Sequence, residues 1–187
     1  MNAQQTHIHF RPNQDKIVEA IVWIAQQRPG IGFHAILKLL FFADKYHLNR
    51  YERPVIGDQY IAMQYGPVAS ATYDILKGDA LAMESISASV LPFVVEYRGK
   101  PSVHALREPD LDFFSESDIE ALEWSNTSFG SLGFAQLTDL SHNDRSYQSA
   151  VDRDLNSPML YEEMLDDSEY YHNTIQYLRE NAPFMVL

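Results

Sequence analysis

The residues of this chain with the clearest potential for chemistry are a carboxylate and an imidazole in one apolar stretch. Asp44 and His47 are three residues apart, so a helix would place them on one face, and Asp58 could supply a third metal ligand from the next segment. A metal-dependent hydrolase would need all three correctly placed. The alternative is that Asp44 and His47 satisfy each other at the edge of the core, beside Leu40 and Leu48. We favour this structural role and expect no metal and no cofactor.

Other catalytic motifs are missing or incomplete. The Gly-Ile-Gly segment at residues 30–32 lacks the third glycine of a dinucleotide fingerprint and precedes no βαβ pattern. No GxxxxGK[ST] phosphate loop occurs, and the glycines at 130 and 133 lack the G-x-S-x-G spacing of a nucleophile elbow. Ser141, His142 and Asp144 are neighbours in sequence, but a triad is defined by its geometry in space. We therefore expect a protein that is not an enzyme.

The charge of the chain is unevenly distributed. Residues 1–110 hold 11 Lys/Arg and 11 Asp/Glu, whereas residues 111–187 hold 3 Lys/Arg and 15 Asp/Glu, so the whole net charge of −12 lies in the second part. Such a surface repels phosphate backbones, and no nucleic-acid partner is expected. It would attract a basic partner protein, although an acidic face can also serve solubility alone. Carboxylates expected to be exposed there include Glu162, Glu163, Asp166 and Asp167.

A helix-turn-helix is the main argument for DNA binding. Two predicted helices, at about 13–28 and 33–50, flank a Pro-Gly turn. The second helix offers His34, Lys38 and Lys45 as polar side chains, but the run from Leu39 to Phe42 is typical of a helix that packs in a core. Together with the acidic net charge, this pattern does not favour a DNA-binding protein.

Length and composition favour one cytoplasmic domain. The chain of 187 residues is of ordinary single-domain size, and no repeat or linker divides it. Without cysteine it can form neither a disulfide nor a thiolate zinc site. The polar N-terminus does not resemble a signal peptide, and no apolar run approaches the roughly 20 residues of a membrane span. We expect one domain over residues 1–187, with residues 1–12 as a flexible segment and no membrane association.

The hydrophobic pattern predicts a mainly α fold: a compact, multi-helix single domain with a small β component. The first helix should follow Asn13, a good N-cap residue, and end at Pro29-Gly30. The second helix is apolar nearly all round and belongs at the centre of the core. Residues 60–65 are typical of a short strand, and residues 93–98 and 102–107 of a hairpin around Gly-Lys-Pro.

Turn and capping residues predict the remaining helices. Gly66-Pro67 should open a helix that continues to Lys77 and ends at Gly78, because proline suits the first turn. The segment from Ser115 to Asp118 has the form of a capping box, so another helix should begin there. Further helices are expected over residues 137–142, 158–165 and 168–180.

An ordered series of motifs resembles a known family. KLLFFADKYHL at residues 38–48 is followed by RPVIGDQY at 53–60, MQYGPV at 63–68, and then Tyr-Asp at 73–74 and Gly-Asp at 78–79. This series, over about residues 36–79, is similar to the Panacea domain of SocA-like antitoxins, which share K-L-L-[YF]-F-A…H-L, R-P-[LIV]-x-G-D-x-[YF] and Y-G-P-V. Weaker similarity occurs at residues 115–122 and at 140–142, after which Tyr147 stands where tryptophan is common in the family.

The resemblance implies an antitoxin of a toxin–antitoxin system, which neutralises a cognate toxin protein by direct binding. Some members of the family act instead as adaptors that deliver the toxin to a protease. Members with an added DNA-binding domain can also repress transcription, but this chain has no room for a clear one. The toxins paired with the domain are chemically diverse, so the family does not identify the toxin.

Candidate toxin-binding residues lie in the second half of the motif series: Asp58, Tyr60, Tyr65, Gly66, Pro67 and Tyr73. Tyrosine is enriched in interface cores, and the free amides of a helix that begins at Pro67 could meet a carboxylate. The alternative is that the motif specifies the fold, with Asp58 bonding nearby backbone amides and most of these tyrosines packed internally. Recognition would then fall to the acidic C-terminal half. The sequence leaves both possibilities open.

Overall fold

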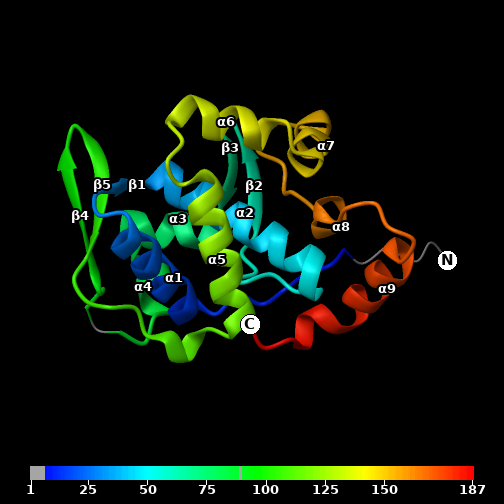
Figure 1. Cartoon of the computed structure of the whole chain (residues 1–187), viewed down its shortest axis with the longest axis horizontal. Helices are drawn as coiled ribbons and strands as arrows, with labels where there is room; N and C mark the ends of the chain where they lie inside the picture. Colours follow the sequence, from blue (N-terminus) through cyan, green and yellow to red (C-terminus); the bar gives the residue numbers. More distant parts are fainter. Residues whose placement is uncertain (1–6, 89) are drawn as a thin grey trace.

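Helix α2 (Phe33–Tyr51) lies at the centre of the fold, with the other elements arranged around it (Figure 1). The structure is a computed structural model that describes residues 7–88 and 90–187. The α2 side chains from Ile36 to Ala43 are at most 8% exposed, as expected for a helix that is apolar on all sides. Helix α5 (Glu116–Phe129) packs along α2. The predicted mainly α fold with a minor β component is confirmed.

Side-chain caps fix the starts of the helices that flank α2. Helix α1 (Gln14–Gln27) begins where predicted, because the Asn13 side chain accepts hydrogen bonds from two backbone N–H groups of the first turn. The predicted capping box of α5 is also present. The side chains of Ser115 and Asp118 each accept a hydrogen bond from the backbone N–H of the other residue.

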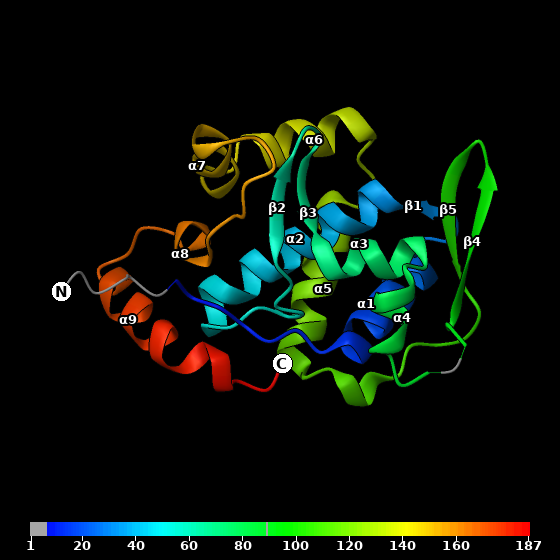
Figure 2. The same ribbon diagram turned by 180° about the vertical axis from the view of Figure 1, so that it is seen from behind.

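Two small antiparallel sheets complete the N-terminal part. Strands β4 (Phe93–Arg98) and β5 (Lys100–Ala105) form the predicted hairpin, but β5 begins two residues before the predicted start, because Lys100 and Pro101 already pair with β4. Strand β1 (Ile31–Gly32) adds to β5, giving the order β1-β5-β4. Strand β2 (Tyr60–Met63) pairs with β3 (Gly66–Ala69), with Met63 opposite Gly66. Figure 2 shows the β2–β3 hairpin beside α2, with its tip next to α6 (Phe134–His142).

The prediction that Gly66-Pro67 opens a helix is wrong. Gly66 has φ +95°, a left-handed conformation that suits glycine, and it turns the chain back along β2. Pro67 then lies in β3, which is an edge strand of a two-stranded sheet, and proline is tolerated in edge strands. Helix α3 (Ser70–Lys77) begins only after β3, and it ends at Gly78 as predicted.

The C-terminal part differs more from the predictions. Predicted helices at 137–142 and 168–180 correspond to α6 and to α9 (Tyr171–Asn181). The predicted helix at 158–165 is reduced to α8 (Tyr161–Met164), because the preceding residues lie extended beside β2, where the Met159 N–H donates to the Tyr60 carbonyl at 2.9 Å. The remaining short helices in the described residues are α4 (Ala80–Glu84), η1 (Leu111–Phe113) and η2 (Ala182–Phe184).

Helix α7 (Arg145–Arg153) is not predicted by the hydrophobic pattern. Its sequence is short and largely polar, and its buried face consists only of Ser146, Tyr147 and Ala150, which is too few apolar side chains to indicate a helix. Asp144 defines its start, because the Asp144 side chain accepts a hydrogen bond from the Ser146 N–H at 2.9 Å.

The described N-terminal residues are anchored to the C-terminal part. The expected flexible segment, residues 1–12, includes residues 1–6, which lie outside the described part. Within residues 7–12, the Ile8 and Phe10 side chains are 5% and 1% exposed. The Ile8 N–H donates to the Glu162 carboxylate at 3.1 Å, and Phe10 packs edge-on against Tyr161.

Glu162 is therefore not the exposed carboxylate that the sequence suggests. Its side chain is buried and pairs with Arg179 at 3.2 Å. Glu163 is partly buried and pairs with Arg153 at 2.6 Å. The exposure expected for Asp166 and Asp167 is confirmed. No helix within the described residues combines the length and the hydropathy that a bilayer crossing requires.

Candidate functional site

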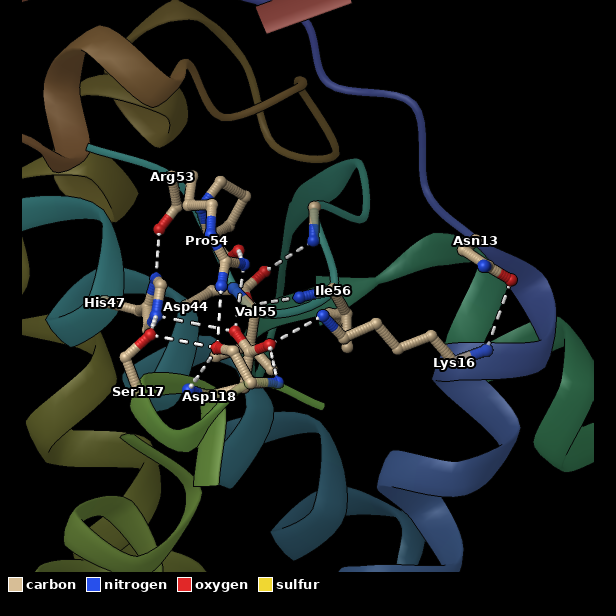
Figure 3. Close-up of polar contacts among 12 residues, drawn as sticks. Asn13, Lys16, Asp44, His47, Arg53, Pro54, Val55, Ile56, Ser117 and Asp118 are labelled. Atoms are coloured by element: carbon tan, nitrogen blue, oxygen red, sulfur yellow. Dashed lines mark hydrogen bonds and ion pairs between the residues drawn. The ribbon is translucent and has the colours of Figure 1, made fainter. Parts of the chain in front are cut away.

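Asp44 holds the loop that leaves α2. Its carboxylate is fully buried and accepts the backbone N–H groups of residues 55, 56 and 57 at 2.8, 2.9 and 3.2 Å (Figure 3). The Tyr60 hydroxyl donates a fourth hydrogen bond at 2.9 Å. Burial raises the pKa of Asp44 to about 7, against the effect of the donors, which favour the carboxylate. Asp44 is thus a buried acceptor for the segment at residues 53–60.

His47 is engaged at both ring nitrogens. Nδ1 lies 2.6 Å from the Arg53 carbonyl, which can only accept, so Nδ1 carries the proton. Nε2 lies 2.9 Å from the Ser117 hydroxyl, which is then the donor (Figure 3). Burial lowers the pKa of His47, in keeping with a neutral ring. Both nitrogens therefore have partners within the fold.

Asp58 caps helix α3. Its carboxylate accepts the backbone N–H groups of Ala71 and Thr72 at 3.0 and 2.8 Å, and also the Thr72 hydroxyl at 2.8 Å. Its side chain is 1% exposed, and burial raises its pKa. This cap explains why the helix begins at Ser70, because it satisfies amides that a helix start leaves free.

Asp44, His47 and Asp58 therefore do not converge on a metal position. Each is bound to a different part of the chain, and no hydrogen bond joins Asp44 to His47 within the described residues, so the expectation that they satisfy each other is wrong. Across residues 7–88 and 90–187, no group of three or more His, Asp or Glu side chains has an arrangement suited to a metal ion. The contacts of all three residues stabilise the fold.

Beside this loop, Asp118 joins three elements through ion pairs. Its carboxylate lies 2.9 Å from Lys16 Nζ of α1 and 2.9 Å from Arg53 Nη1 of the loop (Figure 3). Burial alone would raise the pKa of Asp118, but Arg53 and Lys16 hold it below its ordinary value. The N-terminus of α5 is thereby tied to α1 and to the start of the family-like motif.

A groove opens at the N-terminal end of α2, next to the turn of the β2–β3 hairpin. Its volume is about 520 Å³. Its walls come from α2, the β2–β3 hairpin, α3, the start of β5 and α6, and are mostly apolar or aromatic. The lining residues are Gly32, Phe33, His34, Leu37, Lys38, Met63, Gln64, Tyr65, Val68, Tyr73, Lys100, Pro101, Phe134 and Asn156.

Aromatic contacts across the groove join residues far apart in sequence. The Phe134 ring of α6 lies 4.1 Å from the His34 ring and 5.4 Å from the Tyr65 ring, measured between centroids. On the opposite wall, Phe33 and Tyr73 meet edge-on at 6.5 Å. Tyr65 and Phe134 remain 53% and 50% exposed, although both are large apolar side chains. The groove thus presents ordered aromatic surface to the solvent.

The six candidate binding residues separate into two groups. Tyr65 and Tyr73 line the groove. Tyr60 is 1% exposed and, like Asp58, belongs to the core. Gly66 and Pro67 are also buried and shape the turn beneath the groove.

The sequence does not indicate that residues of α2 and α6 form a groove together. His34 and Lys38 do stand out there as polar positions in an otherwise apolar helix, which is a usable signal. Nothing in the sequence, by contrast, joins Phe134 to them, because the contact is made across a separation of 100 residues.

Lys38 lies at the floor of the groove. Its side chain is 1% exposed, and Nζ donates to the Pro67 carbonyl at 2.8 Å. Among residues 7–88 and 90–187, no carboxylate forms an ion pair with it. Burial lowers the pKa of Lys38 to about 7. Burial also lowers the pKa of His34 to about 4, so this ring is neutral at physiological pH.

Comparison with protein families matches residues 36–147 to the antitoxin SocA-like, Panacea domain. This match covers more than half of the chain, and the chain belongs to this family of antitoxins. It also extends the resemblance seen at residues 36–79 through α5 and α6 to Tyr147. No curated protein and no solved structure matched the chain.

Proposed function

We propose that this protein neutralises a cognate protein toxin by binding it directly, and that the groove at the N-terminal end of α2 is the contact surface. The observation that carries the proposal is the exposed aromatic pair Tyr65 and Phe134, held in place within the segment that matches the antitoxin family. Large aromatic side chains anchored in a pocket supply most of the binding energy in many protein interfaces.

Binding is favoured over catalysis because the side chains best suited to chemistry already have partners in the fold. Asp44 and Asp58 accept backbone N–H groups, and His47 is bonded at both nitrogens. The aromatic rings of the groove, by contrast, have exposed faces and edges that a partner could cover. A protein that acts by contact needs such a surface and no reactive group.

Co-expression with the protein encoded beside this chain provides the test. We expect the chain to rescue growth and to co-purify with that toxin as a stoichiometric complex. Tyr65→Ala and Phe134→Ala should each weaken both effects while the melting temperature stays near that of the wild type. Tyr177→Ala is the matched control, because Tyr177 is 46% exposed on α9 and is not among the groove residues.

Two results would contradict the proposal. Rescue without a detectable complex would argue for an enzyme that acts on the product of the toxin. Equal loss of binding in the Tyr177→Ala control would place the contact elsewhere. A complex that forms but rescues only in cells containing a particular protease would identify the chain as an adaptor that binds the toxin and delivers it for degradation.

A further inference from the structure

In the part of the chain that the structure describes, the groove is lined by basic and not by acidic side chains, whereas the molecule as a whole is acidic. The chain has a net charge of −12, yet the described residues that line the groove include two lysines, Lys38 and Lys100, and neither aspartate nor glutamate. A cavity lined by one sign of charge between apolar walls favours ligands of the other sign. The groove is therefore suited to an occupant that is apolar along most of its length and negatively charged at one point.

Lys38 determines where in the groove the negative charge of an occupant would lie. A buried ammonium without a carboxylate partner is energetically unfavourable, and the single bond to the Pro67 carbonyl uses one of its three donors. The backbone makes room for the side chain at this place. A Cβ on Gly66 would lie 2.8 Å from Lys38 Cε, so glycine leaves the space that the lysine side chain occupies against the β2–β3 turn.

The start of α2 lies on the same groove. Gly32 is its N-cap and supplies no side-chain acceptor for the first-turn amides, in contrast to Asn13 at the start of α1. Free amides at a helix N-terminus favour negative charge nearby. Gly32, Phe33 and His34 all line the groove together with Lys38. The buried lysine and the start of the helix thus both favour an anion in this groove.

We propose that the groove binds a segment of the toxin that carries a carboxylate beside an apolar or aromatic side chain, and that this carboxylate forms an ion pair with Lys38. The inference rests on the proposed function, because the occupant is part of the toxin. The aromatic walls formed by Tyr65 and Phe134 receive the apolar side chain, and Lys38 selects the charged one. The toxin can be basic overall and still present such a segment.

Formation of this ion pair has a protonation signature. The pKa of Lys38 is lowered to about 7 in the free protein, and a paired carboxylate would raise it. At pH 8 most Lys38 side chains in the free protein are neutral, and each of these becomes protonated when the ion pair forms. Complex formation at pH 8 should therefore take up close to one proton per complex. His34 remains neutral in this range. The other titratable groups on the elements around Lys38 are Tyr60 and Tyr65 of the β2–β3 hairpin, Tyr73, Asp74 and Lys77 of α3, Asp139 and His142 of α6, and Lys100 and His104 of β5.

The test is calorimetric titration of the toxin into wild-type protein and into Lys38→Met, in two buffers of different ionisation enthalpy at pH 8. We expect Lys38→Met to weaken binding by about 30-fold or more and to abolish the proton uptake. Arg98→Met is the matched control, because it removes one positive charge at a side chain that is 88% exposed on the β4–β5 hairpin. Its affinity and proton uptake should equal those of the wild type.

A second variant set identifies the carboxylate of the toxin. Aspartates and glutamates of the toxin are changed one at a time to asparagine and glutamine. One change should weaken binding to the wild type and have no further effect on binding to Lys38→Met, since the pair is then already broken. If Lys38→Met does not fold, the proton uptake of the wild-type complex and this scan of the toxin still decide the question.

The possible outcomes separate the two proposals. No complex between wild-type protein and toxin would overturn the proposed function itself. A wild-type complex that forms without proton uptake, and that Lys38→Met forms equally well, would overturn the role of Lys38 and leave the antitoxin function intact. If Lys38→Met binds the toxin more weakly but no aspartate or glutamate change in the toxin weakens binding to the wild type, the proposed ion pair is also overturned.

Discussion

Two neighbouring segments of the family region contain similar side chains but use them in different ways. In residues 53–60, Asp58 and Tyr60 are buried and bonded within the fold: Asp58 caps α3, and Tyr60 donates to Asp44. In residues 65–73, the two tyrosines line an open groove. Tyr60 and Tyr65 are five residues apart, yet they are 1% and 53% exposed.

This difference shows how the parts of a motif can be assigned. A side chain whose polar atoms are satisfied inside the fold is there to stabilise a loop or a helix start, and its loss should appear as lost stability. A large aromatic side chain that is ordered but uncovered is available to a partner, and its loss should appear as lost affinity. The two segments therefore predict opposite patterns in experiments on the same variants.

The largest effect is expected in the buried segment, from Asp44→Ala. The change leaves three backbone N–H groups and the Tyr60 hydroxyl without their acceptor in the core. We expect the free energy of unfolding to fall by about 4 kcal/mol or more, measured by urea denaturation. Asp152→Ala, at an exposed position of α7, is the control and should stay within about 0.5 kcal/mol of the wild type. An Asp44→Ala protein as stable as the wild type would contradict the conclusion that the buried polar side chains stabilise the fold.

The next largest effect is expected on the pH dependence of stability, and it comes from Lys38. This side chain is buried, like those of residues 53–60, but it lines the groove, like the tyrosines of residues 65–73. Its pKa is about 7 in the folded protein, below the ordinary 10.5 of the unfolded chain. Between these values the unfolded state binds more protons, so stability rises with pH. From pH 7 to 9.5, the wild type should gain roughly 3 kcal/mol relative to Lys38→Met.

Denaturant titrations of both proteins across this pH range measure the gain. The difference between the two removes the contribution of Lys16, whose pKa is also lowered. The range ends at 9.5 because burial raises the pKa of Tyr60 and Tyr161 well above 10, which reverses the slope at higher pH. Parallel curves for the two proteins would mean that Lys38 is not a buried charge, and the case for an ion pair in the groove would fall with it.

The fold was largely predictable from the sequence, because its main helices carry strong local signals. The all-round apolar pattern of α2, the Asn13 cap and the Ser115 capping box are each contained in a few adjacent residues. Predictions failed where tertiary contacts overrode such signals. Pro67 favours a helix start, but pairing of β3 with β2 and the Asp58 cap move the start to Ser70.

The candidate site was predictable only in part. Tyr65 and Tyr73 lie in the recognisable motif, but the groove exists because α6 brings Phe134 to the start of α2. Such a contact depends on how helices pack, which periodicity within one helix does not specify. Tyr60 shows the converse, since its residue type suggested an interface and its hydrogen bond to Asp44 places it in the core.

Substitutions at the two tyrosines test the comparison directly. Tyr65→Ala should weaken toxin binding by about 2 kcal/mol, mainly through faster dissociation, and change stability by less than about 1 kcal/mol. Tyr60→Phe should do the reverse, lowering stability by about 1 kcal/mol through loss of the bond to Asp44 and leaving affinity unchanged. Melting temperature and surface-plasmon-resonance kinetics on both variants provide the measurement. If Tyr65→Ala lowers stability and affinity together, Tyr65 supports the fold and is not an anchor.

The smallest effect is expected from the acidic C-terminal part, which sharpens the comparison by separating attraction at a distance from contact in the groove. Asp152, Asp154 and Glu169 are exposed, unlike Glu162, and are suitable for replacement by their amides. If the toxin is basic, the triple variant should associate several-fold more slowly at low salt, because steering depends on net charge. Stability should change by less than about 0.5 kcal/mol.

Association and dissociation rates measured from low to high salt distinguish the two contributions. Screening shortens the reach of exposed charges to about 8 Å at physiological ionic strength, so the triple variant should approach the wild-type association rate as salt is added. Its dissociation rate should equal that of the wild type throughout, because the groove contacts are intact. Tyr65→Ala should show the complementary pattern, with normal association and fast dissociation. A triple variant that associates at the wild-type rate at every salt concentration would remove the acidic part from recognition, and its charge would then serve solubility alone.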